Sequence, residues 1–388
     1  MNVFFVVPEW AAQARTGGHY VEHDLVRAVA QSASVHLAVV GDPPLPRPSV
    51  ALAGFDCFRR RPPGFWDRVL GPLPTLSLWS RGAGLPQKAA TVARAVAPCT
   101  LLVSRSYAVA DLPVNAFARF VVATQNVESQ RLSAFAISAR GSSGQLWKRL
   151  QAARMARLEK RIFASADAVL ALSRRDQERL AHLVRPGIPV LFFPPLPDPD
   201  LLATPMAPRP DDVLLFVGSL DYPPNTVAAE RLLVEIFPRV RAERASARLV
   251  IAGSTPSDAL RARVAQTPGA TLIPDFDALA PLHAAATVFV SPLDAQEGIS
   301  VKTLAAFAAG TPVVAPRAVL ESLGVAHDHV ALEGDTSEQI AVELLRLLSS
   351  EPLRRDLSGR ARETIRERFS PESRRQALTT ALGTDDAA

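Results

Sequence analysis

The segment that most constrains this chain runs from Glu297 to Val314 and reads E-G-I-S-V-K-T-L-A-A-F-A-A-G-T-P-V-V. It joins one apolar strand to the next through a glycine-containing loop and a helix of small residues, so a helix N-terminus lies where it can bind an anion. The first backbone N–H groups of such a helix have no intrahelical partners and carry the positive end of the helix dipole; here they belong to Gly298, Ile299 and Ser300. Lys302 adds a full charge, and the Glu297 carboxylate can accept hydrogen bonds from sugar hydroxyls. The segment predicts a site for a phosphate-bearing, hydroxyl-rich ligand.

The bulk properties of the chain predict a cytoplasmic protein of two domains. Its 388 residues are too many for one ordinary core, and 48% hydrophobic with 21% charged residues is typical of a soluble globular protein. No apolar run is long enough to cross a membrane, and the first residues, MNVFFVVPEW, read as a strand and not as a signal peptide. Cys57 and Cys99 are too few for a disulfide framework and lack metal-ligand spacing.

The charge balance favours anionic partners. The formal net charge is +5, which indicates affinity for anionic ligands or for an anionic membrane surface, so peripheral contact with the inner membrane face stays open. Nucleic acid is the weaker interpretation, because aromatic residues make up only 6% of the chain and no recognition motif occurs. We therefore expect no nucleic-acid partner.

Apolar runs alternate with amphipathic segments along the chain, which predicts parallel sheets flanked by helices. The strands expected in the first half are Val3–Val7, Val35–Val40, Thr100–Ser104, Phe120–Thr124 and Ala168–Leu172, and those in the second half are Val213–Val217, Arg248–Ala252, Thr271–Ile273, Val288–Ser291 and Pro312–Ala315. His19–Gln31 and Gln145–Phe163 read as helices, whereas the Pro-rich stretch 41–87 is unassigned beyond loops and short helices.

A cluster of prolines between residues 194 and 210 predicts an interdomain linker, since proline continues neither a helix nor a central strand. We expect an N-terminal Rossmann-like domain over residues 1–195, the linker over 196–210 and a C-terminal Rossmann-like domain over 211–369. Residues 370–388 form a helix and tail that return to the first domain. Two doubly wound α/β domains would enclose a cleft at the carboxyl ends of their strands, which is the usual ligand position in such sheets.

Two turns after first-domain strands carry candidate ligand residues. Gly17 and Gly18 open a helix, where glycines permit positive φ and close approach of a ligand, although a tight turn explains them equally well. Gln125, Asn126 and Glu128 follow a strand and are expected to line the cleft on the acceptor side; the alternative is a helix start capped by Asn126 or Ser129.

In the second domain the loop from Ser219 to Asn225 is the counterpart of the first glycine turn, with Asn225 able to cap the following helix. Ser173 and Asp176, in contrast, read as a capping pair without further function.

His19 and His23 stand four residues apart on one expected helix, but no third ligand is nearby, so we expect no metal and place His19 in the cleft. The basic residues of Gln145–Phe163 form a solvated helix face in the favoured interpretation and a lipid-docking face in the other.

Taken together, these motifs resemble the retaining nucleotide-sugar glycosyltransferases of the two-domain GT-B fold, family 4 and its relatives. The resemblance includes Gly17-Gly18, N-V-E-S at Asn126–Ser129 and A-D-A-V-L-A-L-S-x-x-D at Ala166–Asp176. It continues with V-G-S-L-D-Y-P-P-N at Val217–Asn225, V-I-A-G at Val250–Gly253 and the segment ending A-A-G-T-P-V-V, and it is strongest for the branch with Y-x-P-N after the first strand of the second domain.

The resemblance implies a donor site with a Glu–seven residues–Glu motif, in which the first Glu meets the donor sugar and the second the ribose. Glu297 matches the first position, but Ala305 stands at the second. Hydrogen bonds to a charged group contribute about 1.5–3 kcal/mol each, so their loss weakens donor binding by roughly 10²- to 10⁴-fold unless something replaces them. Ser219 stands where the family often has a diphosphate-binding Arg, and Gln125 where it often has His.

The function implied is metal-independent, retaining transfer of a sugar from a nucleotide sugar to a hydroxyl of a glycan, lipid or small-molecule acceptor. No bound cofactor is expected, and Glu297 and Lys302 are the catalytic candidates, with Lys302 and backbone amides stabilising the leaving group. One alternative is a GT-B protein with impaired donor binding that acts as a partner or scaffold of another transferase. A phosphorylase or an epimerase on the same fold is a third, weaker interpretation.

Overall fold

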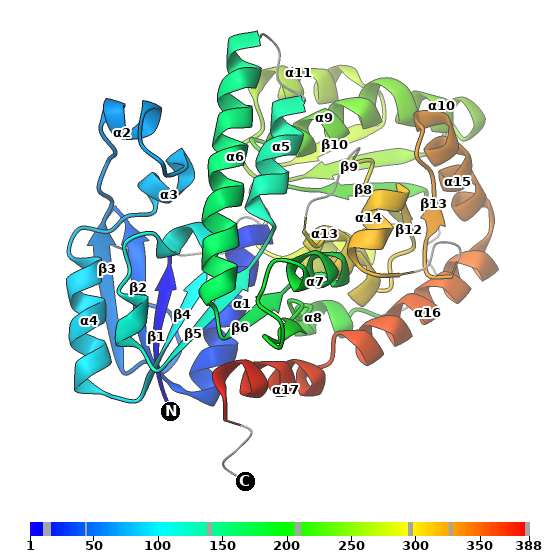
Figure 1. The fold of residues 1–388 in the computed structure, drawn as a ribbon. Coiled ribbons are helices and arrows are strands. Elements are labelled where there is room, and N and C mark those ends of the chain that lie inside the picture. The colour runs from blue at the N-terminus through cyan, green and yellow to red at the C-terminus, as the bar shows by residue number, and fades with distance from the viewer. Residues whose placement is uncertain are drawn as a thin grey trace. The chain divides into compact units, whose positions relative to one another are not determined.

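The computed structural model describes residues 1–10, 17–42, 45–137, 142–205, 211–293, 298–325 and 329–384. The chain forms two compact units (Figure 1). Unit 1 comprises Met1–Ala14, Gly18–Pro195 and Glu372–Ala388, and unit 2 comprises Arg15–Gly17 and Leu196–Pro371. None of the described helices is long and apolar enough to cross a membrane.

Unit 1 is built on a seven-stranded parallel sheet with the order β3-β2-β1-β4-β5-β6-β7. Its strands are β1 (Asn2–Val7), β2 (Ser34–Gly41), β3 (Gly54–Arg59), β4 (Cys99–Ser104), β5 (Arg119–Thr124), β6 (Ala168–Ala171) and β7 (Val190–Phe192). Its helices are α1 (Gly17–Ser32), α2 (Phe65–Val69), α3 (Thr75–Trp79), α4 (Leu85–Ala95), α5 (Glu128–Ile137), α6 (Ser142–Ser165), α7 (Arg174–Ala181) and α17 (Pro371–Leu382), with 3₁₀ turns at Ser106–Val109 and Val114–Ala116.

Side chains of β1 alternate between two buried cores, because successive residues of a strand point to opposite faces of the sheet. Phe4 and Val6 belong to a core with residues of α4, α6 and α7. Val3, Phe5 and Val7 belong to a core with residues of α1 and α17. Helices therefore cover both faces of the sheet, as expected for a parallel sheet, and the layers are visible in Figure 1.

Unit 2 is built on a six-stranded parallel sheet with the order β10-β9-β8-β11-β12-β13. Its strands are β8 (Val213–Val217), β9 (Arg248–Ala252), β10 (Ala270–Ile273), β11 (Val288–Val290), β12 (Val313–Ala315) and β13 (Leu332–Glu333). Its helices are α8 (Pro199–Leu202), α9 (Pro223–Arg231), α10 (Phe237–Glu243), α11 (Asp258–Gln266), α12 (Leu279–Ala285), α13 (Val301–Ala308), α14 (Arg317–Ser322), α15 (Ser337–Ser349) and α16 (Glu351–Arg368), with a π-helical turn at Leu232–Ile236.

The prediction of two doubly wound α/β domains is confirmed, and each strand expected from the sequence forms within a residue or two of its predicted bounds. Three edge or near-edge strands were missing from the prediction. Residues of β3 and β7 are only half-buried, apart from one exposed residue at the end of β3, and β13 has two residues. Such strands lack the continuous buried apolar run that marks a central parallel strand.

The C-terminal helix α17 packs within unit 1. Arg374 forms a buried ion pair with Asp24 of α1, with 2.6 Å between Arg374 Nη2 and Asp24 Oδ2. The Arg119 guanidinium of β5 donates to the backbone carbonyls of Thr380 and Ala381 at the end of α17. The sequence alone gave no sign of these ion and hydrogen-bond partners.

The proline cluster between residues 194 and 210 contains a short helix, α8, which the sequence did not predict. Pro199 is the first residue of α8, a position that tolerates proline because its missing N–H would have no helical partner. The Asp198 carboxylate accepts from the backbone N–H of Asp200 at 3.0 Å and caps the helix. Residues 206–210 of the predicted linker lie outside the described residues.

Candidate functional site

The strongest candidate site of unit 2 lies where β8 ends and α13 begins. Asn225, in the first turn of α9, and Lys302, in the first turn of α13, meet there, with 2.5 Å between Lys302 Nζ and Asn225 Oδ1. The Asn225 amide donates to the carbonyl of Ser219 at 2.8 Å, which orients its oxygen toward the lysine. Lys302 Nζ also lies 4.9 Å from the ring centroid of Phe216, close enough for a cation–π interaction.

Burial lowers the pKa of Lys302 to about 7, well below the ordinary value of a lysine. The physical cause is desolvation, since a neutral carboxamide and an aromatic face replace the water around the ammonium. An anionic ligand would restore the favourable environment of the charge. The ammonium is therefore well placed to bind a phosphate.

Two glycines allow the loops around Lys302 to approach one another. A Cβ atom on Gly218 would lie 2.8 Å from Asn225 Cγ and 2.9 Å from Lys302 Nζ. A Cβ on Gly253, after β9, would lie 1.8 Å from the carbonyl oxygen of Gly218. Since side chains do not fit at either position, the ends of β8 and β9 are held in contact behind the lysine.

We expect Gly253→Ala to destabilise the protein by about 3 kcal/mol, because the new methyl group collides with backbone that cannot rotate away. Gly359→Ala, in α16, is the control: its Cβ meets nothing within 4 Å, so this change should stabilise by about 0.5–1 kcal/mol. Urea unfolding measures both. Equal stability of the two variants would contradict the packing described here.

The loop before α13 agrees in part with the expected anion site. Gly298 has a φ of +66°, which favours glycine, and Ile299 and Ser300 are buried. The Ser300 N–H, expected to be open to a ligand, instead faces Ser322 Oγ at 3.3 Å. Its hydroxyl pairs with Thr303 Oγ1 at 2.9 Å. The N–H of Ser300 therefore holds the start of α13 against α14, and its hydroxyl bonds within the first turn of α13.

Ser219 is engaged by its own loop. Its hydroxyl donates to the Asp221 carboxylate at 2.5 Å and lies 3.4 Å from Ser254 Oγ. The Ser219 hydrogen bond holds the pKa of Asp221 below its usual value, so this carboxylate is ionised at neutral pH. The negative charge of Asp221 repels a phosphate, so Lys302 is the residue at this site that attracts one.

The expected capping role of Asn225 is wrong. Tyr222 is the N-cap of α9, and Asn225 is its third residue, whose side chain bonds to Ser219 and Lys302 instead. Ala305 is a buried residue of α13. Glu297 lies outside the described residues, so its catalytic role stays a prediction.

A second candidate site occupies the carboxyl edge of the unit 1 sheet, and the sequence interpretation missed its central residues. Arg105 directly follows β4 and pairs with Glu22 of α1 and with Glu9 after β1, both at 3.0 Å. Arg105 Nη1 also donates to the Tyr107 hydroxyl at 2.7 Å. Glu22 is buried, whereas Glu9 is partly exposed and can reach a ligand.

The backbone at Arg105 is strained, with a φ of +77° that is rare for a residue with a side chain. Its N–H donates to the Ala123 carbonyl of β5 at 2.7 Å, which helps to hold this conformation. Burial raises the pKa of Glu22 to about 7, although Arg105 opposes the shift. Burial lowers the pKa of His19, and Arg105 and His23 add to the effect while Glu9 opposes it. The cluster thus places titratable groups beside a strained arginine.

The residues predicted after the first-domain strands differ from expectation. Gly17 and Gly18 form the first turn of α1 and have no positive φ, so the conformational reason given for them is wrong. Gln125 donates to the Gly18 carbonyl at 3.3 Å. Asn126 precedes α5 and accepts from Thr124 Oγ1 through its carbonyl. Neither Asn126 nor Ser129 is the group that satisfies the start of α5.

The start of α5 is satisfied by a residue from another helix. The Glu159 carboxylate of α6 accepts from the backbone N–H groups of Glu128 and Ser129, at 2.8 and 3.1 Å. Glu128 is buried and pairs with Arg131 at 2.7 Å. The predicted cap of α7 is confirmed, because Ser173 Oγ accepts from the Asp176 N–H at 3.0 Å.

One of the two histidines of α1 has an aromatic partner. The His23 ring stacks on Trp10 at a centroid distance of 4.2 Å, with 5° between the planes. Within the described ranges, no three His, Cys, Asp or Glu side chains lie close enough to hold a metal ion.

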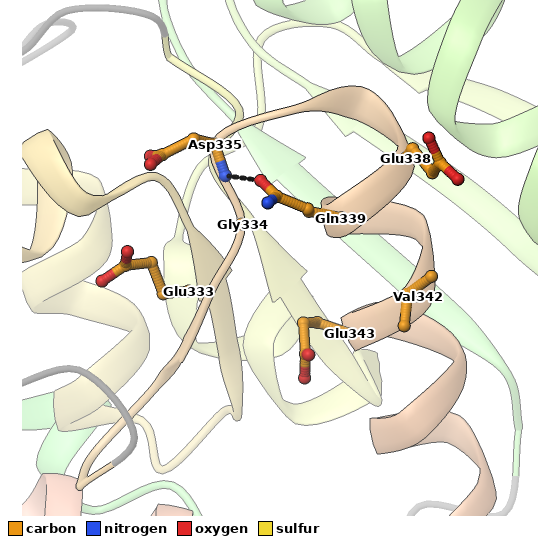
Figure 2. A pocket seen from close by; sticks show the side chains of 7 residues that line it. All are labelled: Glu333, Gly334, Asp335, Glu338, Gln339, Val342 and Glu343. Carbon is orange, nitrogen blue, oxygen red and sulfur yellow. Dashed lines mark hydrogen bonds between the residues drawn. The ribbon is translucent and has the colours of Figure 1, made fainter.

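A hollow beside β13 and α15 is unsuited to phosphate. Figure 2 shows that it is lined by Glu333, Gly334, Asp335, Glu338, Gln339, Val342 and Glu343. The Gln339 side chain accepts from the backbone N–H of Asp335 at 3.0 Å, as part of the cap of α15. Four carboxylates around one hollow repel an anion, and Glu333 and Glu343 pair with Arg317 and Arg346.

Comparison with known proteins assigns the fold and a family signature in unit 2. Residues 211–350 match the family model described as glycosyl transferases group 1. No curated protein matches the chain significantly. Anabaena Alr3699/HepE, solved with UDP and glucose, is similar with a TM-score of 0.68 and 13% identity over 99% of this chain and 100% of that one. Sucrose-phosphate synthase from Thermosynechococcus elongatus has a TM-score of 0.68 and 17% identity over the full length of both chains.

Other solved structures show the same architecture. WaaG, a glycosyltransferase involved in lipopolysaccharide biosynthesis, has a TM-score of 0.66 and 15% identity over 98% of this chain and 100% of that one. Against the longer TarM structures the chain spans 55% and 59% of their length. At these identities the similarity establishes the fold, which is the two-domain α/β GT-B fold. Both the Asn225–Lys302 pair and Ala305 fall within the matched residues.

Proposed function

We propose that the protein is a glycosyltransferase that moves a sugar from a nucleotide-sugar donor to a hydroxyl of an acceptor. The observation that carries the proposal is the Lys302 ammonium, held by Asn225 beside the end of β8, within the residues that match the glycosyl transferases group 1 model. Its anion-binding chemistry fits a diphosphate. Structures of Alr3699/HepE, which has the same fold, contain UDP or UDP-glucose, which makes a uridine nucleotide the first donor to test.

The transfer breaks the bond between the anomeric carbon and the diphosphate, which departs with the bonding electrons. Charge then develops on the diphosphate, and Lys302 stabilises it more strongly than it stabilises the intact donor, which is electrostatic catalysis. The acceptor oxygen forms the new bond to the anomeric carbon, and its proton passes to an oxygen of the departing diphosphate. We assign to Glu297 contact with the donor sugar, and we propose retention of configuration and independence from metal ions, as the resemblance implies.

We place acceptor binding at the carboxyl edge of the unit 1 sheet. The partly exposed Glu9 carboxylate, held by Arg105, can accept hydrogen bonds from acceptor hydroxyls. His19, whose pKa is lowered, is neutral at physiological pH and can donate or accept there. These features suit a polyhydroxylated acceptor, on a glycan, a lipid or a small molecule. Free thiols at Cys57 and Cys99 agree with a cytoplasmic location.

The direct test is consumption of donor. The purified protein is incubated with UDP-, GDP-, ADP-, CDP- and TDP-sugars and a mixture of acceptor oligosaccharides, and released nucleoside diphosphate is measured. We expect release from one base class, increased by acceptor. Absence of release from every donor, by a protein that unfolds cooperatively, would contradict transferase activity.

Binding of nucleoside diphosphate should depend on pH through Lys302. The pKa of Lys302 is about 7 in the free protein, and a bound diphosphate raises it, so binding takes up a proton above pH 7. Affinity should therefore fall by up to about tenfold per pH unit between pH 7 and pH 9 and change little below pH 7 on this account. Calorimetry in buffers of different ionisation enthalpy measures the proton uptake. Lys302→Met should abolish it, and identical uptake by this variant would refute the assignment.

Ala305→Glu should tighten nucleoside diphosphate binding by about tenfold or more, because a carboxylate on α13 would bond to ribose hydroxyls. The side chain is buried, so the same change should also lower the stability of the free protein. Ala305→Gln is the matched control of similar size. Unchanged affinity in both variants would mean that the ribose does not lie beside α13.

A second candidate function is a donor-impaired GT-B protein that acts as a partner of another transferase. It is favoured by Ala305, by Gln125 and by Ser219, which stands where the family often has a diphosphate-binding Arg and bonds to Asp221 instead. This alternative predicts weak or absent binding of every nucleoside diphosphate.

A further inference from the structure

More than half of the large apolar side chains that are exposed among the described residues gather on three short stretches of unit 1. They are Phe65, Trp66 and Leu70 at α2, Trp79 at α3, and Leu146, Trp147 and Leu150 near the start of α6. Trp66 is 68% exposed, Leu70 72% and Leu146 70%, although each carries a side chain that normally avoids water. We call these seven residues the α2–α3–α6 surface.

Hydrogen bonds join the helices of this surface. The Arg154 guanidinium of α6 donates to the carbonyls of Arg68 and Val69 at the end of α2, at 2.8 and 2.7 Å. Gln151, one turn from Trp147, accepts from the Thr75 N–H at the start of α3 at 2.7 Å. Leu150 lies one turn before Arg154, and Leu70 follows Val69, so their apolar side chains lie on adjoining elements. Figure 1 shows α2 and α3 beside the upper half of α6.

The surface is also strongly basic. Residues 59–81 and 142–161 together contain eleven Lys and Arg residues and two acidic residues, Asp67 and Glu159. Of the basic residues, Arg154 is buried, and Arg81 and Arg60 pair with Asp111 and Glu9. Glu159 of α6 is buried, and its carboxylate accepts from the first N–H groups of α5, so it does not neutralise the exposed basic side chains. The exposed cations of α6 are Lys148, Arg149, Arg157, Lys160 and Arg161.

From this combination we propose that the α2–α3–α6 surface docks unit 1 onto an anionic lipid bilayer. Tryptophan and phenylalanine favour the boundary between lipid headgroups and acyl chains, where an apolar ring contacts the chains and its polar edge contacts water. Leucines add apolar area, and the flanking lysines and arginines contact anionic headgroups. The inference concerns attachment and is independent of sugar transfer.

A second copy of the chain is the poorer occupant. A symmetric dimer through this surface would bring two strongly basic surfaces face to face, and like charges oppose such contact. An anionic bilayer instead complements the charge and covers the apolar side chains at the same time. An acidic protein partner would be negatively charged like the bilayer, but it lacks the boundary between headgroups and acyl chains that suits indole rings. The experiment below distinguishes a bilayer from such a protein.

The test is flotation of the full chain with lipid vesicles. Phosphatidylcholine vesicles are compared with vesicles that also contain about 30% phosphatidylglycerol, at about 0.1 M and 0.5 M salt. We expect at least about tenfold stronger binding to the anionic vesicles, weakened by salt, with a blue shift of tryptophan fluorescence. Trp66→Phe and Trp147→Phe should each reduce that shift, because both indoles enter the lipid interface.

The variant Phe65→Ser/Trp66→Ser/Leu70→Ser should bind anionic vesicles at least about tenfold more weakly. Val227→Ser/Val234→Ser, which changes exposed apolar residues of unit 2, is the matched control and should bind like wild type. Leu146→Ser/Leu150→Ser repeats the test on α6 if the first variant unfolds. The contribution of charge is tested in the same way. Binding of Lys148→Gln/Arg149→Gln/Arg157→Gln to anionic vesicles is compared with binding of the control variant Arg346→Gln/Arg355→Gln/Arg375→Gln.

Three results would overturn the proposal. The first is no binding to anionic vesicles by folded wild-type protein. The second is equal loss in the surface variants and their controls. The third is a partner other than lipid. This would be seen either as a stable dimer in light scattering that the serine variant dissociates, or as capture of an acidic protein by a chain that does not bind vesicles.

Discussion

Lys302→Met should lower sugar transfer by about 100- to 1,000-fold, the usual effect of removing one group that stabilises a developing negative charge. The same change should leave the free energy of unfolding unchanged or slightly increased. Burial lowers the pKa of Lys302 to about 7, so the fold disfavours its charge in the absence of a ligand, and methionine removes that cost. Turnover with the active donor and urea unfolding at pH 7 measure the two effects.

The opposite responses of activity and stability distinguish a binding residue from a structural one. Lys88→Met is the control, since Lys88 pairs with Asp56 at 3.0 Å in unit 1 and takes no part in the proposed site. That variant should retain its turnover. Wild-type turnover in Lys302→Met, or a large loss of stability, would show that the lysine has a different role.

Arg105→Met should destabilise the protein by about 3–5 kcal/mol at pH 8, the typical cost of leaving a buried charge without its partner. Glu22 is 1% exposed, and Arg105 is the cation that pairs with it at 3.0 Å. The double variant Glu22→Gln/Arg105→Met should recover part of the loss, because glutamine leaves no uncompensated charge. Urea unfolding of the wild type, the two single variants and the double variant measures the coupling.

The loss caused by Arg105→Met should depend on pH in a fixed direction. The folded-state pKa of Glu22 is about 7, above the ordinary value of 4.5. The contribution of Glu22 protonation to the free energy of unfolding is therefore fully present below pH 4.5 and is lost as pH rises through 7. Removing Arg105 raises that folded-state pKa further. The deficit should therefore be smaller at pH 5 than at pH 8. A deficit that is equal at both values, or larger at pH 5, would argue against an ionised Glu22 as its source.

The central strands could be predicted from the sequence because their apolar runs are continuous. β8 and β9 form over the predicted residues Val213–Val217 and Arg248–Ala252, and both are central strands of unit 2. β3 could not be predicted in the same way. It lies at the edge of the unit 1 sheet, its first five residues are only half-buried, and prolines surround it.

The candidate sites show what local sequence pattern leaves out. Lys302 was predicted from its place at a helix start, but its bond to Asn225 joins residues 77 positions apart in the chain. Arg105 and Glu22 carry no motif, because a lone arginine after a strand and a glutamate within a helix are ordinary in sequence. Their meaning depends on the alignment of β1, β4 and α1 at one sheet edge, which the fold creates. A signal was present in Ser104-Arg105, polar residues at a predicted strand end.

Thermal unfolding of wild-type protein and Lys302→Met with UDP, GDP, ADP, CDP and TDP, each at about 1 mM, tests the central claim most directly. A ligand at 100 times its Kd stabilises a protein by about 2.7 kcal/mol, which shifts the melting temperature measurably. The account predicts that one nucleoside diphosphate stabilises the wild type and that Lys302→Met loses most of that shift. No shift with any nucleotide, or an equal shift in both proteins, would contradict a diphosphate site at Lys302.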